Sequence, residues 1–196
     1  MDIQTQLYTI ESFEKFLAQP ENAGRNFELI EGSIHEKMSS SFVASVIAAT
    51  IGTHTGNFAA EYNLGYVTGA HGSYILNDDN EFMPDVGFIR KEHLPDLPNR
   101  AALVPPDLAV EVVSPTDSIR IVQKKALHYL ANGTRLVWVV HPAEKIVEVY
   151  RPGEGDDDAR IQLLNMDDAL DGGAVLPGFS LSVRDIFPAE STESPE

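Results

Sequence analysis

Two carboxylates interrupt the most apolar stretches of the chain, and a buried sheet accepts them only under narrow conditions. Asp85 opens the run PDVGFI at residues 84–89, and Glu111 lies inside the run DLAVEVVSP at residues 107–115. Both runs are rich in β-branched residues and nearly continuously apolar, which is typical of buried strands. A carboxylate inside such a strand costs several kcal/mol unless a cation or hydrogen bonds compensate its charge. The sequence therefore predicts a central sheet that holds a cation site.

The remaining segments alternate between helical and strand patterns. Apolar residues at helical spacing predict helices at about residues 9–20, 41–51 and 118–132, the third capped by Asp117. Strand and turn patterns predict a hairpin at 27–38 that turns at Glu31-Gly32, short strands at 65–67 and 73–76, a hairpin at 135–152, and weaker strands at 161–164 and 179–183. This order indicates an α+β fold with α/β/α-like layers, in which a central mixed β-sheet is flanked by helices.

Residues 1–188 are expected to form a single domain, because 196 residues suit one domain with a sizeable core and no linker-like segment interrupts them. Residues 189–196 are polar and acidic, and we expect a disordered tail there. The chain has no cysteine, which excludes disulfides, thiolate zinc sites and a cysteine nucleophile. We expect a cytoplasmic protein without a membrane partner, because no apolar run approaches the roughly 20 residues of a membrane span and the start lacks a signal-peptide pattern.

Net charge limits the partners of the chain. Fourteen basic against 30 acidic residues give −16, which argues against general binding to a polyanion such as nucleic acid. The acidic surplus is concentrated after residue 152, where Arg160 and Arg184 are the only basic residues. Any contact with a phosphate backbone must therefore use a local basic patch. One cluster is expected beside the cation site, formed by Arg90, Lys91, Arg120, Lys124 and Lys125.

A lysine on the third predicted helix is expected near the two acids. At about 100° per residue, Lys125 lies on the helix face between Val122 and Tyr129. Lys124 turns away from that face. The helix follows directly from the Glu111 strand, so doubling back over the sheet brings Lys125 toward the end of that strand. An ammonium group there can hold a phosphate or activate a water.

The chemistry of the predicted site favours a hard divalent cation. Carboxylate oxygens of Asp85 and Glu111, together with a backbone carbonyl and waters, suit Mg²⁺ or Mn²⁺. Zinc is a poor match, because the six histidines show no ligand spacing such as HExxH. Serine hydrolysis fits no better, since no serine lies in a nucleophile elbow.

Several stretches of the chain resemble a known family. They are FELIEGSI near the start, PDVGFI, PPDLAVEVVSPTDS, KALHYLANGTRLVWVVHP and VEVYRP. Together they resemble the bacterial Uma-two family of restriction endonucleases, within the PD-(D/E)xK nuclease superfamily, over roughly residues 8–185. The resemblance implies a restriction-endonuclease-like core, in which a central mixed sheet flanked by helices carries metal-binding acids on adjacent strands.

The same resemblance implies roles for individual residues. Asp85 matches the aspartate that follows the family's proline, and Glu111 matches the acid of its EV(V/I)SP strand. Lys125, four residues before Tyr129, matches a lysine that the family places on the following helix. Glu28 matches the acid of the (Y/F)EL(I/V)(D/E)G hairpin, where a third carboxylate reaches the metal or its water.

The chain departs from the usual nuclease motif at one position and from the family pattern at two places. Val113 occupies the position where the usual nuclease motif has its lysine, two residues after the acid. Ser41-Phe42 stands where the family often has a histidine before the second helix, and His141 replaces the aspartate before Pro142. None of these positions is one of the metal-binding acids, so the implied metal site is unaffected.

The leading hypothesis is a metal-dependent endonuclease that hydrolyses phosphodiester bonds in DNA. Asp85, Glu111 and the Val112 carbonyl would hold one Mg²⁺ or Mn²⁺. Lys125 would orient or deprotonate the attacking water or steady the developing charge on phosphorus, and Glu28 would position the metal's water shell. Two alternatives stay open: a noncatalytic regulatory or interaction module on a nuclease scaffold, which the acidic surplus favours, and a metal-dependent hydrolase of small phosphoesters. By analogy with nucleases that pair to cut two strands, we expect a homodimer.

Overall fold

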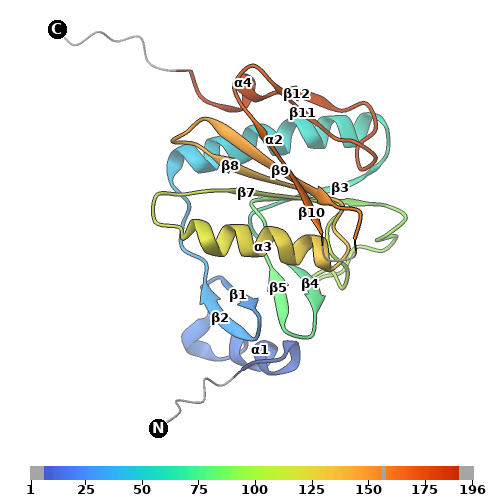
Figure 1. The fold of residues 1–196 in the computed structure, drawn as a ribbon. Helices are drawn as coiled ribbons and strands as arrows, with labels where there is room; N and C mark the ends of the chain where they lie inside the picture. The colour runs from blue at the N-terminus through green and yellow to red at the C-terminus, as the bar shows by residue number, and fades with distance from the viewer. Residues whose placement is uncertain (1–6, 156–157, 190–196) are drawn as a thin grey trace, which may run out of the picture.

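A six-stranded mixed sheet forms the centre of the computed structural model, which describes residues 7–155 and 158–189 (Figure 1). Its strands lie in the order β10–β9–β8–β7–β6–β3, and β7 and β8 are its one parallel pair in these ranges. The strand bounds are β3 Gly65–Gly69, β6 Val86–Arg90, β7 Leu108–Val112, β8 Leu136–His141, β9 Ile146–Pro152 and β10 Ala159–Leu164. The predicted central mixed sheet is confirmed. The tail predicted at 189–196 lies outside the described residues except for its first member.

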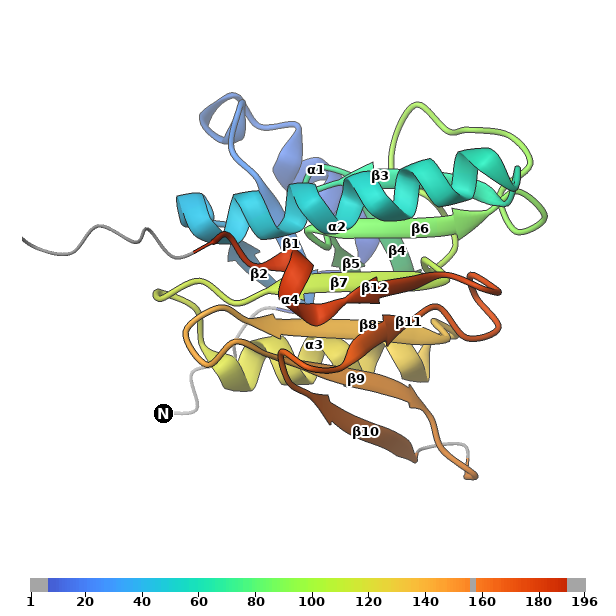
Figure 2. The same ribbon diagram turned by 90° about the horizontal axis from the view of Figure 1, so that it is seen from above.

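Helices cover both faces of this sheet (Figures 1 and 2). The helix α2 Phe42–Glu61 packs on β3, β6 and β7, whereas α3 Ile119–Ala131 packs on β8 and β9. A C-terminal hairpin of β11 Ala169–Asp171 and β12 Ser180–Ser182, followed by the short α4 Val183–Ile186, lies on the α2 side (Figure 1). The predicted arrangement of a sheet between helices is thus confirmed.

Alternation along β7 sends its side chains into two different cores. Leu108, Val110 and Val112 pack in the larger core cluster, which includes residues of α2. Ala109 packs in a second cluster with residues of α3. Because side chains alternate with a period of two along a strand, Glu111 also faces α3. It is the one charged residue on a strand whose other four side chains are apolar.

A second sheet of four short strands, in the order β2–β1–β5–β4, carries the N-terminal part of the candidate site. Its bounds are β1 Phe27–Ile30, β2 Ser33–Glu36, β4 Tyr74–Asn77 and β5 Asn80–Phe82. The turn between β1 and β2 is the predicted Glu31-Gly32, with φ angles of 48° and 71°. Positive φ at both central residues matches the twist of a tight hairpin. The helix α1 Ile10–Leu17 packs against this sheet and precedes a short 3-10 helix at Pro20–Asn22.

The structure departs from the sequence predictions at several elements. The helix α2 continues well past residue 51, because Thr55 and Ala59 extend its buried face. The strands β5 and β11 have no predicted counterpart, since strands this short carry little pattern. The predicted helix cap Asp117 is wrong: α3 begins after Ser118, and Asp117 Oδ2 instead accepts the backbone N–H of Ser114 at 2.7 Å. No helix in the described ranges is both long and apolar enough to cross a membrane.

Candidate active site

Asp85 and Glu111 meet across neighbouring strands. Val86, the first residue of β6, pairs with Val110 of β7, so Asp85 lies just before β6 at the end of the sheet where Glu111 follows Val110. The backbone N–H of Asp85 donates to the Val110 carbonyl at 2.9 Å, which holds this residue beside β7. Both carboxylates are buried, and they lie close enough that the negative charge of Asp85 adds to the effect of burial in raising the pKa of Glu111. The structure therefore brings the two predicted acids together in a place that needs compensating cations.

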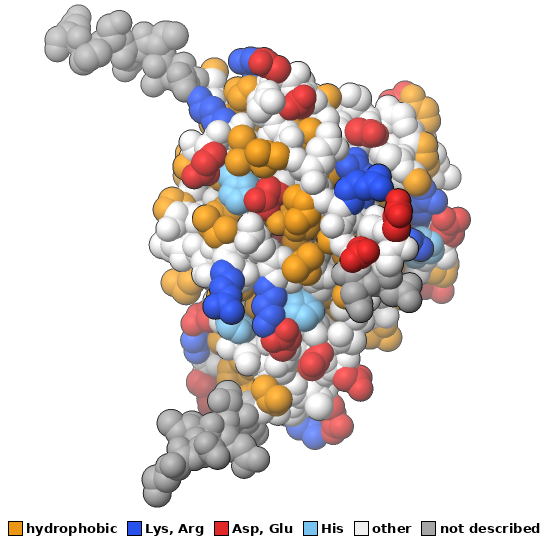
Figure 3. All heavy atoms as spheres, in the orientation of Figure 1, with side chains coloured by type: hydrophobic (Ala, Val, Ile, Leu, Met, Phe, Trp, Pro, Cys, Tyr) orange, Lys and Arg blue, Asp and Glu red, His pale blue; other side chains and the backbone are white. Residues whose placement is uncertain are grey.

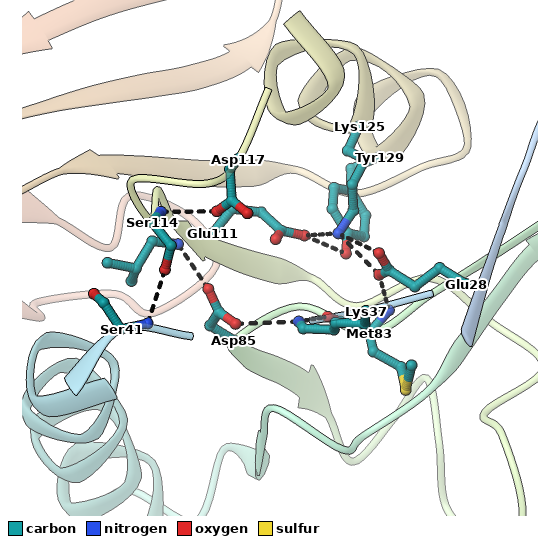
Figure 4. A network of polar contacts seen from close by, with 11 residues as sticks. Glu28, Lys37, Ser41, Met83, Asp85, Glu111, Ser114, Asp117, Lys125 and Tyr129 are labelled. Atoms are coloured by element: carbon teal, nitrogen blue, oxygen red, sulfur yellow. Dashed lines mark hydrogen bonds and ion pairs between the residues drawn. The ribbon is translucent and has the colours of Figure 1, made fainter. Parts of the chain in front are cut away.

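Glu111 receives its compensation from α3 (Figure 4). Lys125 Nζ lies 2.7 Å from Glu111 Oε1, and the Tyr129 hydroxyl donates to the same oxygen at 3.0 Å. Burial raises the pKa of the Glu111 carboxyl, and the ammonium groups of Lys125 and Lys37 offset this effect only in part. No described residue hydrogen-bonds to the other carboxylate oxygen, Oε2. Glu111 thus keeps one oxygen available to a ligand.

The helix face predicted for Lys125 is confirmed. Val122 and Tyr129 are buried beside it, and Lys125 itself is only 4% exposed. Burial alone lowers the pKa of an ammonium group, but the carboxylates of Glu111 and Glu28 outweigh burial and raise the pKa of Lys125 above its ordinary value. Lys125 is therefore held in its charged form.

Glu28 reaches the same place from β1 of the smaller sheet. Its Oε1 and Oε2 accept hydrogen bonds from Lys125 Nζ at 2.9 and 3.2 Å, and Oε1 also accepts the backbone N–H of Met83 at 2.7 Å. Both oxygens of Glu28 are thus engaged by the chain itself. The structure brings Glu28 into the site but sets its carboxylate against the lysine.

Asp85 is held from two sides. Its Oδ2 accepts the backbone N–H of Val112 at 2.8 Å, and its Oδ1 pairs with Lys37 Nζ at 3.1 Å. Lys37 follows β2, and its ammonium also donates to the Met83 carbonyl at 2.5 Å. A lysine from the smaller sheet therefore balances Asp85, just as a lysine from α3 balances Glu111.

These side chains line one polar cavity of about 300 Å³. Its charged lining residues are the acids Glu28, Glu36, Asp85, Glu111 and Asp117 and the bases Lys37 and Lys125. The excess of carboxylates gives the cavity a field that favours cations. Figure 4 shows that the two lysines come from opposite sides, each directed at one of the two strand acids.

A serine ties the start of α2 to the segment that leads into α3. Ser114 Oγ accepts the backbone N–H of Ser41 at 3.1 Å, and the backbone N–H of Ser114 donates to Asp117 Oδ2. Ser114 is buried and lies two residues after β7. This link fixes the wall of the cavity next to the end of the strand that carries Glu111.

The donors of this cavity fit a hard divalent cation. Asp85 and Glu111 offer carboxylate oxygens, and Val112 lines the cavity with them. Within the described ranges, no three acid, histidine or cysteine side chains converge as a complete metal cluster. Glu28 also lines the cavity, with both of its oxygens hydrogen-bonded to Lys125. A bound Mg²⁺ or Mn²⁺ would complete its shell with backbone oxygen, water or substrate.

Two contributors to the site were not assigned from the sequence. Tyr129 served only as a spacing landmark, although its hydroxyl binds Glu111 directly. Lys37 was not singled out at all. One signal was available for it, because Lys37 is the only lysine or arginine between Arg25 and Arg90. A lone basic residue in so long a stretch is a candidate partner for a buried acid.

The predicted basic cluster divides into separate groups. Arg120 and Lys124 are exposed on α3, near the cavity. Arg90 and Lys91 instead lie at the opposite end of β6 from Asp85, so the prediction is wrong for these two residues. It relied on nearness along the chain, whereas an extended strand of this length carries its ends about 17 Å apart.

Comparison with known proteins identifies the fold and the family of the chain. A solved chain from Anabaena variabilis ATCC 29413, described as a "putative nuclease belonging to DUF820", shares the fold with a TM-score of 0.76 at 24% sequence identity, covering 89% of this chain and 96% of that one. No curated protein matches the chain. The model of the Uma2 family, described as "Putative restriction endonuclease", matches residues 13–184. Since this match takes in both sheets and the helices between them, the chain belongs to the Uma2 family.

Proposed function

We propose that this chain is a metal-dependent endonuclease that hydrolyses phosphodiester bonds in DNA. The observation that carries the proposal is that two buried carboxylates, Asp85 and Glu111, line one cavity on a restriction-endonuclease-like sheet. Burying two like charges side by side costs stability even when lysines balance them. A role in holding a catalytic cation gives a reason for that cost, which a purely structural role does not.

Asp85, Glu111 and the backbone carbonyl of Val112 would hold one Mg²⁺ or Mn²⁺. When bound, such an ion polarises a phosphoryl oxygen and lowers the pKa of a coordinated water. The open Oε2 of Glu111 supports this assignment, because it accepts no hydrogen bond from a described residue. Burial raises the pKa of Glu111, so a divalent charge nearby would stabilise its ionised form.

Lys125 would act as an electrostatic group and not as a base. Its neighbouring carboxylates overcome the effect of burial on its pKa, so it stays protonated near neutral pH and has no lone pair to accept a proton. Beside Glu111, its ammonium would orient the attacking water or stabilise charge that develops on the phosphoryl oxygens. Glu28 would position that ammonium, since both of its oxygens bond to it.

DNA is the proposed substrate, and its contact with the chain would be local. Figure 3 shows Lys and Arg side chains in small separate groups on a surface that also carries many acids. Arg120 and Lys124 are the exposed cations of α3, whose neighbours Ile121 and Lys125 line the cavity. So few phosphate contacts give weak, salt-dependent binding. We therefore expect DNA ends and branched DNA, whose strands can bend into a recessed site, to be cut in preference to long duplex.

Cleavage of labelled single-stranded, duplex and branched DNA in Mn²⁺, Mg²⁺ or EDTA tests this proposal. We expect metal-dependent cutting that Asp85→Asn and Glu111→Gln each reduce by roughly a hundredfold or more. Asp96→Asn, on an exposed loop, is the matched control and should cut at the wild-type rate. Thermal melting establishes that each variant is folded, and calorimetric titration with Mn²⁺ measures metal affinity separately from cutting.

Two results would contradict the proposal in different ways. A folded, metal-binding chain that leaves every DNA intact but hydrolyses mononucleotide esters would be a hydrolase of small phosphoesters. A folded chain that binds no metal and cuts nothing would be a noncatalytic module on a nuclease scaffold.

A further inference from the structure

A basic pocket lies at the other end of the central strands from the candidate active site, where β6 and β9 end and β7 and β8 begin. The pairing of β6, β7, β8 and β9 brings four charged residues to this end of the strands: Arg90, Asp107, Arg135 and Arg151. β6 and β7 are each five residues long, so this end of the strands lies about 17 Å from Asp85 and Glu111. The pocket is therefore separate from the cavity proposed to hold the metal.

The lining of this pocket is positive in a strongly acidic chain. It has a volume of about 470 Å³, and three arginines face it while Asp107 is its one acid among the described residues. Asp107 is buried and already engaged, because its carboxylate accepts the backbone N–H of Arg90 at 2.8 Å and lies 2.9 Å from Nδ1 of His93. The active-site cavity has the opposite balance, with five acids against two lysines. The cavity at one end of the strands thus favours cations, and the pocket at the other end favours anions.

The arginines keep donors to spare. The guanidinium of Arg135 has no hydrogen-bond or ion-pair partner among the described residues, although its backbone N–H donates to the Asp107 carbonyl. Arg151 donates once, from Nη2 to the Asp171 carbonyl at 3.3 Å. Since a guanidinium carries five N–H donors in a planar fork, both side chains can bind an incoming anion without breaking a contact.

We propose that this pocket binds the terminal phosphate of a phosphomonoester, held between the guanidinium groups of Arg135 and Arg151. A terminal phosphate carries up to two negative charges and three acceptor oxygens, which match paired guanidinium forks. Gly173 lines the same pocket, and no atom beyond its chain neighbours lies within 4 Å of the place where its side chain would begin, which leaves room for a bound anion. Pro152, also in the lining, offers an apolar surface to the organic part of the ligand.

Two of the arginines also hold the turn that follows β11. Arg90 Nη2 donates to the carbonyls of Ala174 and Val175, and Arg151 binds the Asp171 carbonyl. A loss of phosphate binding on replacing either one could thus come from a displaced turn. Arg135 makes no such contact, so Arg135→Gln separates ligand binding from structure.

Calorimetric titration of the full chain in EDTA, which keeps the proposed metal site empty, tests the pocket. The probes are inorganic phosphate, adenosine 5′-monophosphate, adenosine, and a short oligonucleotide with or without a 5′-phosphate. We expect the phosphate-bearing probes to bind and adenosine and the 5′-hydroxyl oligonucleotide not to bind. Arg135→Gln and Arg151→Gln should each weaken binding by about tenfold or more. Arg184→Gln changes an exposed arginine of α4 that pairs with Asp167 and does not line the pocket, and it should bind as the wild type does.

The two sources of a terminal phosphate give different results. Tighter binding of adenosine 5′-monophosphate than of the 5′-phosphorylated oligonucleotide identifies a free nucleotide as the ligand, and the reverse order identifies a DNA or RNA end. The proposal fails if no phosphate-bearing probe binds the folded chain, if adenosine binds equally well, or if folded Arg135→Gln retains full affinity. Because metal is absent throughout, each of these results is independent of the proposed nuclease activity.

Discussion

The Nζ atom of Lys125 lies 2.7 Å from Oε1 of Glu111, and the two side chains are 5% and 8% exposed. This contact joins the helix α3 to the strand β7 through two charges that are largely buried. The same ammonium also binds Glu28, so one cation balances carboxylates from both sheets. Removing one member of a buried ion pair leaves its partner uncompensated, which costs far more than losing a surface pair.

Replacing Lys125 with methionine should therefore destabilise the chain strongly. We expect Lys125→Met to lower the free energy of unfolding at pH 7 by about 3–5 kcal/mol, because two buried carboxylates lose their cation. Lys124→Met is the matched control, since the adjacent Lys124 is exposed and its pair with Glu31 is worth less than about 1 kcal/mol. Urea unfolding measures both values, and equal losses in the two variants would contradict the buried-pair interpretation.

Lys37 should compete with a metal ion for Asp85. Its ammonium lies 3.1 Å from Asp85 Oδ1, and a cation at that distance repels a divalent ion bound to the same carboxylate. Lys37→Met should raise the affinity for Mn²⁺ severalfold in calorimetric titration. Lys15→Met, at an exposed lysine of α1, should leave the affinity unchanged. Weaker metal binding by Lys37→Met would show that the lysine supports the site and does not oppose the ion.

Metal should also protect the folded state. A ligand that binds only the native chain adds about 2.7 kcal/mol of stability at a free concentration 100 times its dissociation constant. We expect Mn²⁺ at that level to raise the melting temperature of the wild type and to leave Glu111→Gln unchanged. An equal rise in both proteins would place the bound ion somewhere other than at Glu111.

The hydroxyl of Tyr129 should fix the orientation of the Glu111 carboxylate. A hydrogen bond to a charged group contributes about 1.5–3 kcal/mol, so Tyr129→Phe should lower the free energy of unfolding by that amount. Tyr62→Phe, at an exposed tyrosine after α2, should have no measurable effect. A Tyr129→Phe variant as stable as the wild type would mean that water or another group replaces the hydroxyl.

Glu81, in the smaller sheet, should give stability a pH dependence that lies outside the active site. Burial raises the pKa of its carboxyl, and the hydrogen bond from Ser73 Oγ at 2.6 Å offsets this only in part. The folded chain therefore holds a proton that the unfolded chain releases above its ordinary pKa of 4.5. The stability from this group is fully present below that pH and is lost as pH rises through the folded pKa.

Glu81→Gln should make the fall in stability with pH shallower, because the raised pKa of Glu111 still contributes, whereas Glu61→Gln, at the exposed end of α2, should keep the wild-type slope. Urea unfolding from pH 4 to pH 7 measures the two slopes. If Glu81→Gln and the wild type lose stability in parallel over this range, another group is responsible for the pH dependence.

Local sequence patterns were sufficient for the parts of the fold whose neighbours lie close along the chain. The apolar strands around Asp85 and Glu111, the turn at Glu31-Gly32 and the inward face of α3 all follow from residue spacing. The pairing of Asp85 with Glu111 needed the strand register, which depends on the whole sheet. Family resemblance supplied Glu28, because an acid in a hairpin carries no local sign of what it faces.

The rest of the site arises from contacts across long stretches of chain. Lys37 lies 48 residues from Asp85, and no periodic pattern links the two. The basic residues of β6 show the converse error, since Arg90 is near Asp85 in sequence but at the far end of the strand. Which cation balances a buried acid depends on how the two sheets pack, so these partners can be identified only once the packing is known.

The bond between Glu28 and Lys125 joins residues that are 97 positions apart. The N-terminal hairpin must therefore find its place against a sheet and a helix that are synthesised much later, and contacts this distant form slowly. Docking in a wrong register would leave charges of both sheets buried without partners, at a cost comparable to the stability of a whole domain. The polar network thus also selects the register in which the N-terminal hairpin docks, because the neighbouring registers would leave buried charges without partners.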